Sequence, residues 1–416
     1  MKKLIYSSIG ILGMALLLSA CGETDANSPQ GSTIAPAQVK LDGVKNLPGK
    51  SVIYFTQPGD KNFLYMKAVY ETDQGERSIN ASYFADSVVV EGFGQAGTYD
   101  VKLYSVSPGE AYSDPVKVQI NPTEPPYLTA YKELKVTPDF AGIRLKTVNT
   151  GNETLTFYVY KKNDKNELVE AGAVYTKKAE ISEPVRGMDA VPSDFSIVIK
   201  DRWGHLSEAK EVSLTPYYEE EVDKSKMDYL RIGEYKGYLA PNVGTPKNLY
   251  DKKVTGNTFM MDAREAAGYD FTKPSSVTLD LGKKFKLSRL LVQGRRNSST
   301  DYSSIFESLY PKDIEIWGRN DNKVTKFDPV NDPGWVLLYA GYLARADGST
   351  LPGAIVPLTD ADKELAIKGN EIEFSADLDA FRYVTFVCNK NYNSGSSRIN
   401  VAELTFYGTP EDKITK

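Results

Sequence analysis

Most of the chain alternates apolar and polar residues with a period of two, in short runs that Gly, Pro, Asn and Asp interrupt. Val277, Leu279 and Leu281, for example, alternate with Thr278 and Asp280, which is typical of a half-buried strand. No long segment after the first twenty residues shows a helical period. The pattern therefore predicts an all-β protein built from many short strands joined by turns.

The start of the chain departs from this pattern. Residues 1–3 include two lysines, residues 4–18 are almost wholly apolar, and small residues then lead to Cys21. This order is that of a secretory signal, and a cysteine directly after the small residues makes it a lipoprotein signal. We expect residues 1–20 to be removed and Cys21 to carry lipid, which would hold the protein on a membrane outside the cytoplasm.

Two segments repeat the same order of features. Residues 99–120 contain a strand pattern, a Pro-Gly turn, a Ser-Asp pair and a second strand pattern, and residues 195–214 repeat this order with a Trp-Gly turn and a Ser-Glu pair. The serines of the two pairs, Ser113 and Ser207, lie 94 positions apart. That period suits two β-sandwich modules of about 100 residues each.

Proline-rich stretches and changes in composition divide the rest of the chain. We expect a flexible tether at residues 21–37, a first sandwich module at 38–121, a second at 122–217, and a larger strand-rich unit at 218–410. Long polar loops interrupt the last unit. Loops on a rigid β scaffold are where binding residues usually lie.

Composition excludes several classes of function. The 416 residues carry 50 Lys and Arg against 55 Asp and Glu, so no basic surface indicates nucleic acid. After Cys21 the only cysteine is Cys388, at the end of an apolar run, where a small buried residue is a better interpretation than a nucleophile. The single histidine, His205, lies in a turn sequence, and we expect it to be exposed there rather than part of a catalytic triad.

Four stretches of the last unit resemble parts of the discoidin, or coagulation-factor type C, family. In order, they look like its opening loop, its strand and turn with an Asp-Leu-Gly sequence, its central strand and its closing strand, at residues 248–251, 276–282, 310–321 and 398–408. That family has a galactose-binding-like jelly roll fold. The resemblance implies an all-β chain in which two immunoglobulin/fibronectin-like sandwiches precede a discoidin-like jelly roll.

Residues 46–49, 63–68 and 90–94 look like an immunoglobulin- or fibronectin-like domain family found in Bacteroidota-type lipoproteins. The whole layout is similar to cell-surface lipoproteins of polysaccharide-utilisation systems. This resemblance implies an outer-membrane lipoprotein, at the cell surface, that captures a glycan beside an importer complex. It identifies neither the glycan nor the membrane leaflet.

A sugar site combines flat apolar surface for the ring with fixed polar groups for the hydroxyls. Two long polar loops, residues 293–302 and 389–395, contain both kinds of side chain, and in sugar-binding relatives an arginine often contacts ligand at the place of residues 295–296. The candidate ligand-binding residues are Arg295, Arg296, Tyr302, Asn391 and Tyr392, followed by Asp262 and Arg264 on the same rim.

Related jelly rolls often hold a structural calcium between the opening loop and the last strand, where oxygen ligands are needed. The resemblance places Asp251, Asn257 and Glu403 at that ion. Lys252 and Lys253 depart from the family pattern, because they bring two positive charges to a place where the family often has glycine and an acidic residue.

The sequence thus favours a non-catalytic glycan-binding lipoprotein that serves an uptake system. One alternative is a structural or adhesion scaffold that docks on a protein partner. The other is an accessory enzyme of the glycoside hydrolase class, which would need two carboxylates across a cleft. Acidic residues are plentiful, but we find no catalytic motif among them.

Overall fold

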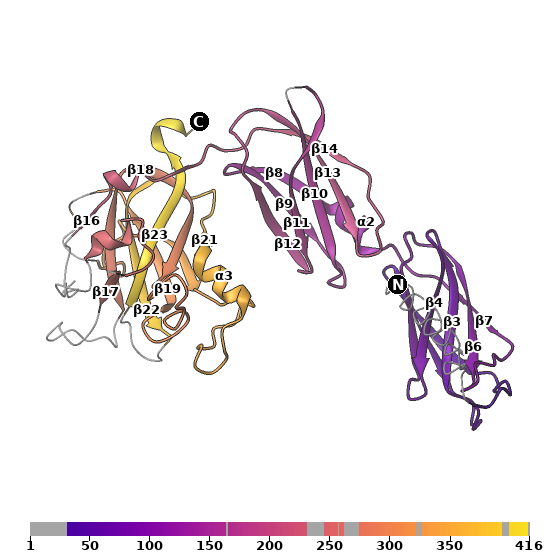
Figure 1. The fold of residues 1–416 in the computed structure, drawn as a ribbon. Coiled ribbons are helices and arrows are strands. Elements are labelled where there is room, and N and C mark those ends of the chain that lie inside the picture. Colours follow the sequence, from indigo (N-terminus) through magenta and orange to yellow (C-terminus); the bar gives the residue numbers. More distant parts are fainter. Residues whose placement is uncertain are drawn as a thin grey trace, which may run out of the picture.

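The computed structural model describes residues 31–163, 165–230, 245–256, 258–261, 274–321, 323, 327–392 and 399–414. In this part of the chain β-strands predominate, which confirms the predicted all-β fold. Three groups of strands follow one another along an elongated molecule (Figure 1). No helix in the described ranges is long and apolar enough to cross a bilayer.

The first module is a sandwich of two antiparallel sheets. Their inner faces enclose one cluster of buried side chains, among them Phe55, Met66 and Leu103. One sheet has the strand order β1-β2-β5 and the other β4-β3-β6-β7. The strands are β1 (Lys40–Leu47), β2 (Lys50–Thr56), β3 (Tyr65–Thr72), β4 (Gly75–Ser82), β5 (Ser87–Glu91), β6 (Tyr99–Val106) and β7 (Val116–Ile120).

The second module is built in the same way, with helix α2 (Pro126–Glu133) packed against its core through Tyr127 and Ala130. Its sheets have the orders β12-β9-β8 and β11-β10-β13-β14. The strands are β8 (Lys135–Asp139), β9 (Gly142–Val148), β10 (Leu155–Lys162), β11 (Leu168–Thr176), β12 (Glu180–Arg186), β13 (Ser193–Asp201) and β14 (Lys210–Leu214).

The sequence repeat corresponds to a repeated contact. In the first module the Ser113 hydroxyl accepts a hydrogen bond from the Ser105 amide at 3.0 Å. In the second, the Ser207 hydroxyl accepts one from the Ile199 amide at 2.9 Å. Each serine also donates to the carbonyl of the residue after it. The two serines therefore pin equivalent turns of the two sandwiches.

The C-terminal domain has the largest core, and one long strand organises it. β18 (Ser275–Gly294) bends at Gly282, where φ is +83°. Before the bend it pairs with β16 (Asp228–Leu230) and β22 (Phe381–Asn391). After the bend it pairs with β21 (Asn370–Glu373) and β23 (Ile399–Pro410), and with β22 only at Phe285. Its two halves therefore belong to two groups of strands on either side of the core. The first and last residues of β18 lie at the same end of the domain.

The remaining elements of this domain are short helices and further strands. They are β15 (Glu220–Glu221), η1 (Lys224–Lys226), β16 (Asp228–Leu230), η2 (Pro246–Leu249), β17 (Phe259–Met261), β18 (Ser275–Gly294), β19 (Pro311–Arg319), β20 (Val336–Tyr342), α3 (Asp360–Lys368), β21 (Asn370–Glu373), β22 (Phe381–Asn391), β23 (Ile399–Pro410) and η3 (Glu411–Lys413).

The first and second modules meet at a joint centred on His205. Its Nδ1 lies 2.7 Å from Asp201 Oδ2, and its Nε2 lies 3.0 Å from Oδ1 of Asp73, in the β3–β4 turn of the first module. The Tyr127 ring stacks on the imidazole, with 5.9 Å between centroids. The expectation of an exposed histidine was wrong, because His205 is 6% exposed and the turn that carries it is covered by the neighbouring module.

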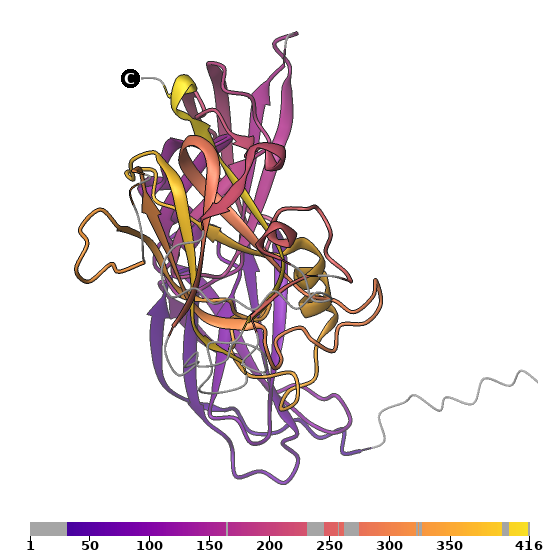
Figure 2. The same cartoon turned by 90° about the vertical axis from the view of Figure 1, so that its left-hand side faces the viewer.

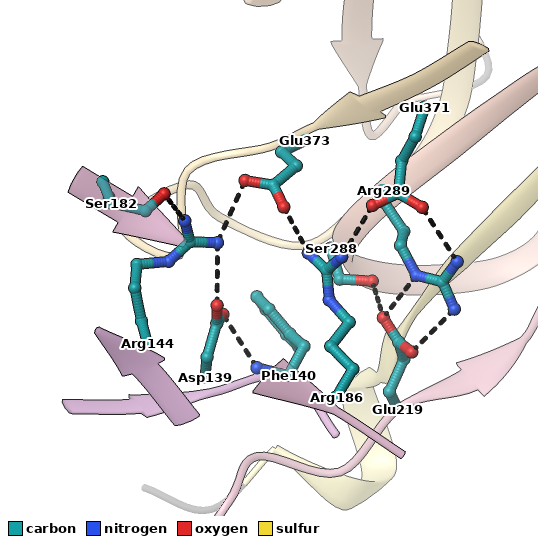
Figure 3. A network of polar contacts seen from close by, with 10 residues as sticks. All are labelled: Asp139, Phe140, Arg144, Ser182, Arg186, Glu219, Ser288, Arg289, Glu371 and Glu373. Carbon is teal, nitrogen blue, oxygen red and sulfur yellow. Dashed lines mark hydrogen bonds and ion pairs between the residues drawn. The ribbon is translucent and has the colours of Figure 1, made fainter. Parts of the chain in front are cut away.

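The second module and the C-terminal domain are joined by arginine–glutamate pairs (Figure 3). Arg186 bonds Glu371 and Glu373, each at 2.6 Å. Arg144 reaches the same Glu373 at 3.0 Å, and Arg289 of the C-terminal domain lies 3.3 Å from Glu371. Charges that share partners in this way fix the orientation of the guanidinium groups better than isolated surface pairs do.

Candidate functional site

Strand register brings the two predicted binding loops to one end of the C-terminal domain. Gly294 lies opposite Val401, and Pro311 lies opposite Asn391. The chain that connects each pair of neighbouring strands therefore leaves and returns at this end. Arg296 also forms a bridge with Thr255 of the opening loop. We call this region, residues 251–256 and 295–310, the loop end.

The start of the longer loop is ordered by its own polar side chains. The side-chain amide of Asn297 donates to Asp301 Oδ2 at 3.0 Å and to the Ser303 hydroxyl at 3.1 Å. The Ser303 amide donates to Asp301 Oδ1 at 2.9 Å. These bonds from Ser303 and Asn297, with the nearby Arg295 charge, lower the pKa of Asp301. The loop end thus presents amide and carboxylate groups in fixed positions.

The two adjacent arginines have different surroundings. Arg296 is 7% exposed and donates from Nη1 to the Ser299 carbonyl at 3.2 Å. Its guanidinium carbon lies 5.7 Å from the centroid of the Tyr302 ring, which packs on the core. Arg295 is half-buried. Within the described ranges, Nε of both arginines finds no hydrogen-bond acceptor.

Chemically, this arrangement can bind a polyhydroxylated ligand. A guanidinium group donates several hydrogen bonds in a fixed plane, and the neighbouring carboxylate accepts them from hydroxyl groups. Arg295 is the better candidate for ligand contact because it is the more exposed of the two arginines. Arg296 is better described as the residue that holds the loop against Tyr302.

Two predicted ligand residues lie beneath the loop end rather than on it, which corrects the expectation for them. Tyr392 is 3% exposed, packs against Phe306 and Tyr310 and donates its hydroxyl to the Leu343 carbonyl at 2.8 Å. Burial raises its pKa. Asn391 is fully buried because β22 continues to that residue. Neither side chain can stack on or bind a ligand at the surface.

Four other candidates lie outside the described residues: Cys21, Asn257, Asp262 and Arg264. Their proposed roles in lipidation, metal binding and ligand binding stay predictions. Cys388 is described, and it is buried in the core with its pKa raised by burial. It has the surroundings of a structural residue, as its sequence context indicated.

The predicted calcium ligand Glu403 already has a cation. Its Oε1 accepts a hydrogen bond from Lys224 Nζ at 2.6 Å, and its Oε2 accepts one from the Lys252 amide at 3.0 Å. The Lys224 ammonium also donates to the Thr405 hydroxyl at 2.7 Å. Burial raises the pKa of Glu403 to about 7, and the Lys224 charge opposes that shift.

The second predicted ligand, Asp251, is also engaged by protein donors. It accepts hydrogen bonds from the Lys253 amide at 3.0 Å and from the Asn248 side chain at 2.8 Å. In the part of the chain that the structure describes, no group of three or more His, Cys, Asp or Glu could hold a metal ion. The described residues therefore do not fit a calcium ion, since the Lys224 ammonium bonds the Glu403 carboxylate.

A hollow at the opposite end of the domain was missed by sequence reasoning. Its volume is about 560 Å³, and Lys284, Asn320, Asp377 and Asp379 contribute polar groups to its lining. These residues come from three separate segments, strand β18, the end of β19 and the turn after β21, and each segment has an ordinary surface composition. No local signal could have shown that they surround one concavity.

Three family models match the chain, and each describes a domain of unknown function. They cover residues 36–122 (DUF4959), 123–225 (DUF5126) and 250–408 (DUF5000). No curated protein matches the chain.

Among solved structures, the chain is similar to a SusE-like protein at 28% identity, covering 69% of this chain and 100% of that one, with a TM-score of 0.39. A putative chitobiase fragment from Bacteroides thetaiotaomicron is 15% identical over 46% of this chain and 94% of that one, with a TM-score of 0.30. A segment of two fibronectin type-III domains from chicken tenascin is 13% identical over 44% of this chain and 99% of that one, with a TM-score of 0.21.

Proposed function

We propose that this protein is a non-catalytic, lipid-anchored outer-membrane protein that captures an oligo- or polysaccharide for uptake. The observation that carries the proposal is the arrangement of Arg295, Asn297 and Asp301 at the loop end. The side chains of Asn297 and Asp301 are held in place by bonds within the loop, and Arg295 lies beside them with an Nε that has no acceptor among the described residues. Because Asn297 and Asp301 are already ordered, little conformational entropy is lost when a saccharide binds them.

The lipid anchor follows from the sequence of the first 21 residues. A lipidated Cys21 would place the three β domains outside the cytoplasm, where polysaccharides are found. The role of the anchor is to keep the binding domain close to an importer, since capture without proximity would not assist uptake. A protein scaffold remains the alternative, and it predicts a protein ligand rather than a saccharide at the loop end.

The test is a binding screen of the purified mature chain against a panel of polysaccharides, with release of reducing sugar measured on the same panel. We expect binding to at least one polysaccharide and no release of reducing ends. Hydrolysis by a homogeneous preparation, lost when one carboxylate is replaced, would show an enzyme instead. Capture of an outer-membrane protein without any glycan binding would favour the scaffold.

A further inference from the structure

The first module has a free end that faces away from the second module. Its β3–β4 turn reaches the second module through Asp73. The loops at residues 57–64, 83–86 and 107–112 connect the opposite ends of the same strands. We call this opposite end the tip. Figure 2 shows the indigo start of the described chain at the lower end of the first module.

Large apolar side chains are exposed at the tip. Phe84 is 92% exposed and Tyr83 is 50% exposed. Their rings meet edge to face at 5.4 Å, and Tyr83 rests on the buried Phe63 ring at 5.9 Å. The Gln57 side chain also holds this turn, by donating to the carbonyls at both of its ends. The aromatic pair is therefore presented to solvent by a braced turn.

Two aliphatic side chains are exposed at the same end of the module. Ile34 and Leu64 are both exposed, and the Leu64 amide donates a hydrogen bond to the Val106 carbonyl at the end of β6. Ile34 belongs to the segment that enters the module from the tether. Exposed aromatic and aliphatic side chains that gather at one place on a protein often mark an interaction surface.

The tether reaches the module at this tip. The Ser32 carbonyl accepts hydrogen bonds from the Gly109 amide at 3.1 Å and from the Ser107 hydroxyl at 2.7 Å. Gly31 lies ten positions after Cys21, and even a fully extended chain of that length spans at most about 33–36 Å. A lipid on Cys21 would thus keep the tip within a few nanometres of the bilayer.

We propose that the tip, formed by Ile34, Leu64, Tyr83 and Phe84, inserts into the interfacial layer of the membrane that holds the anchor. This inference rests on the proposed lipidation of Cys21. Aromatic side chains are enriched in that layer, where their rings lie at the level of the lipid headgroups. The insertion would fix the angle at which the chain of domains leaves the membrane, which one lipidated residue cannot do.

Charge at the tip indicates which force drives the contact. Lys61 is exposed there, but so are Asp86 and Glu110. The acidic side chains outnumber the lysine in these loops, so attraction to anionic lipid does not account for binding. Burial of the apolar side chains must supply the free energy of binding, and insertion should therefore persist at high salt.

The test uses a fluorescent label whose emission reports polarity, attached to Phe84→Cys in the lipidated full-length protein. Cys388 is buried and Cys21 carries the lipid, so the new thiol is the one that reacts. The matched control is Tyr175→Cys on β11 of the second module, where the native side chain is 71% exposed. Both proteins are reconstituted on vesicles of phosphatidylethanolamine and phosphatidylglycerol, and flotation measures anchoring.

We expect the emission at position 84 to shift to shorter wavelength on vesicles, in low and high salt, while the label at position 175 stays in a water-like environment. A protein that floats without any shift at position 84 would overturn the tip proposal and leave the anchor intact. A protein that does not float would overturn the anchor and the tip together. A shift at 84 that requires an added protein would identify a protein partner and overturn the membrane assignment.

Discussion

The tip of the first module exposes aromatic and aliphatic side chains, whereas the loop end of the C-terminal domain exposes guanidinium, amide and carboxylate groups. Both surfaces lie on loops between antiparallel strands, and the strands beneath them bury similar apolar side chains. The scaffold thus sets where a surface is presented, and the few residues in the loops set what it can contact.

The two surfaces are separated by the second module and its two joints. One joint buries a histidine between carboxylates, and the other shares glutamates among arginines. Polar contacts with several partners depend strongly on geometry. They suit an elongated molecule in which the proposed membrane-facing end and the proposed ligand-binding end must remain apart. The following predictions test the parts of this contrast.

The largest effect is expected for Lys224→Met, which removes the cation from the buried carboxylate below the loop end. The side chains of Lys224 and Glu403 are 7% and 2% exposed. Breaking such a pair leaves a buried charge without compensation, which costs roughly 3–5 kcal/mol. The urea midpoint of the C-terminal domain should fall markedly, and Glu403→Gln added to Lys224→Met should restore part of the loss. An unchanged midpoint in the single variant would contradict this account.

The pH dependence of the same carboxyl group is the next largest effect. Its pKa is raised from 4.5 to about 7 in the folded protein, so the folded state binds this proton more tightly than the unfolded state. The free energy of unfolding should therefore fall by roughly 3 kcal/mol as the pH rises from about 4.5 to 7. Glu403→Gln should remove that part of the slope. The measurement is urea unfolding of both proteins at several pH values, and parallel curves would show that the burial argument is wrong.

A smaller effect is expected at the first joint. His205→Ala removes the group that bonds both Asp73 and Asp201. The Asp73 side chain is 57% exposed and Asp201 keeps its bonds from two backbone amides, so the loss is that of ordinary hydrogen bonds, about 0.5–1.5 kcal/mol. The second module should melt at a lower temperature, and small-angle scattering should detect a wider range of angles between the first two modules. Leu206→Ala in the same turn is the control, since Leu206 is exposed. Equal scattering profiles for the two variants would show that His205 does not hold the joint.

The smallest expected effect concerns calcium. Lys224 already bonds the carboxylate that a calcium ion would need, so a chelator should leave the thermal midpoint unchanged. Added calcium should not raise it, because a ligand stabilises a protein only when it binds the folded state. A midpoint that falls in chelator and recovers with calcium would return Asp251 and Glu403 to the role that the family resemblance implied.

The sequence patterns correctly predicted features that depend on local periodicity, such as which residues of a strand are buried. Val277, Leu279 and Leu281 are buried as their alternation indicated. Thr278 on the other face is also buried, because its hydroxyl bonds Thr385 on the neighbouring strand. The serine repeat was visible because both modules use the same turn.

What sequence could not predict depends on contacts between distant segments. His205 was expected in solvent because its partner Asp73 lies 132 positions away. Tyr392 looked like a loop residue because its neighbours are polar, yet the strand before it carries it into the core. The role of Lys224 was invisible for the same reason, since Glu403 is 179 positions away.

The central claim is that the loop end of the C-terminal domain binds a saccharide through Arg295. The most direct test compares Arg295→Ala with Lys284→Ala, using calorimetry with a saccharide found in the screen. Lys284 lines the hollow at the opposite end of the same domain, so it is a matched control. Arg296 is avoided because its buried side chain supports the loop.

Losing a hydrogen bond from a charged donor costs about 1.5–3 kcal/mol, which weakens binding at least tenfold. We predict this loss for Arg295→Ala, with a thermal midpoint equal to that of the unaltered protein, and no loss for Lys284→Ala. Unchanged affinity in Arg295→Ala, or a loss confined to Lys284→Ala, would contradict the assignment of the saccharide to the loop end.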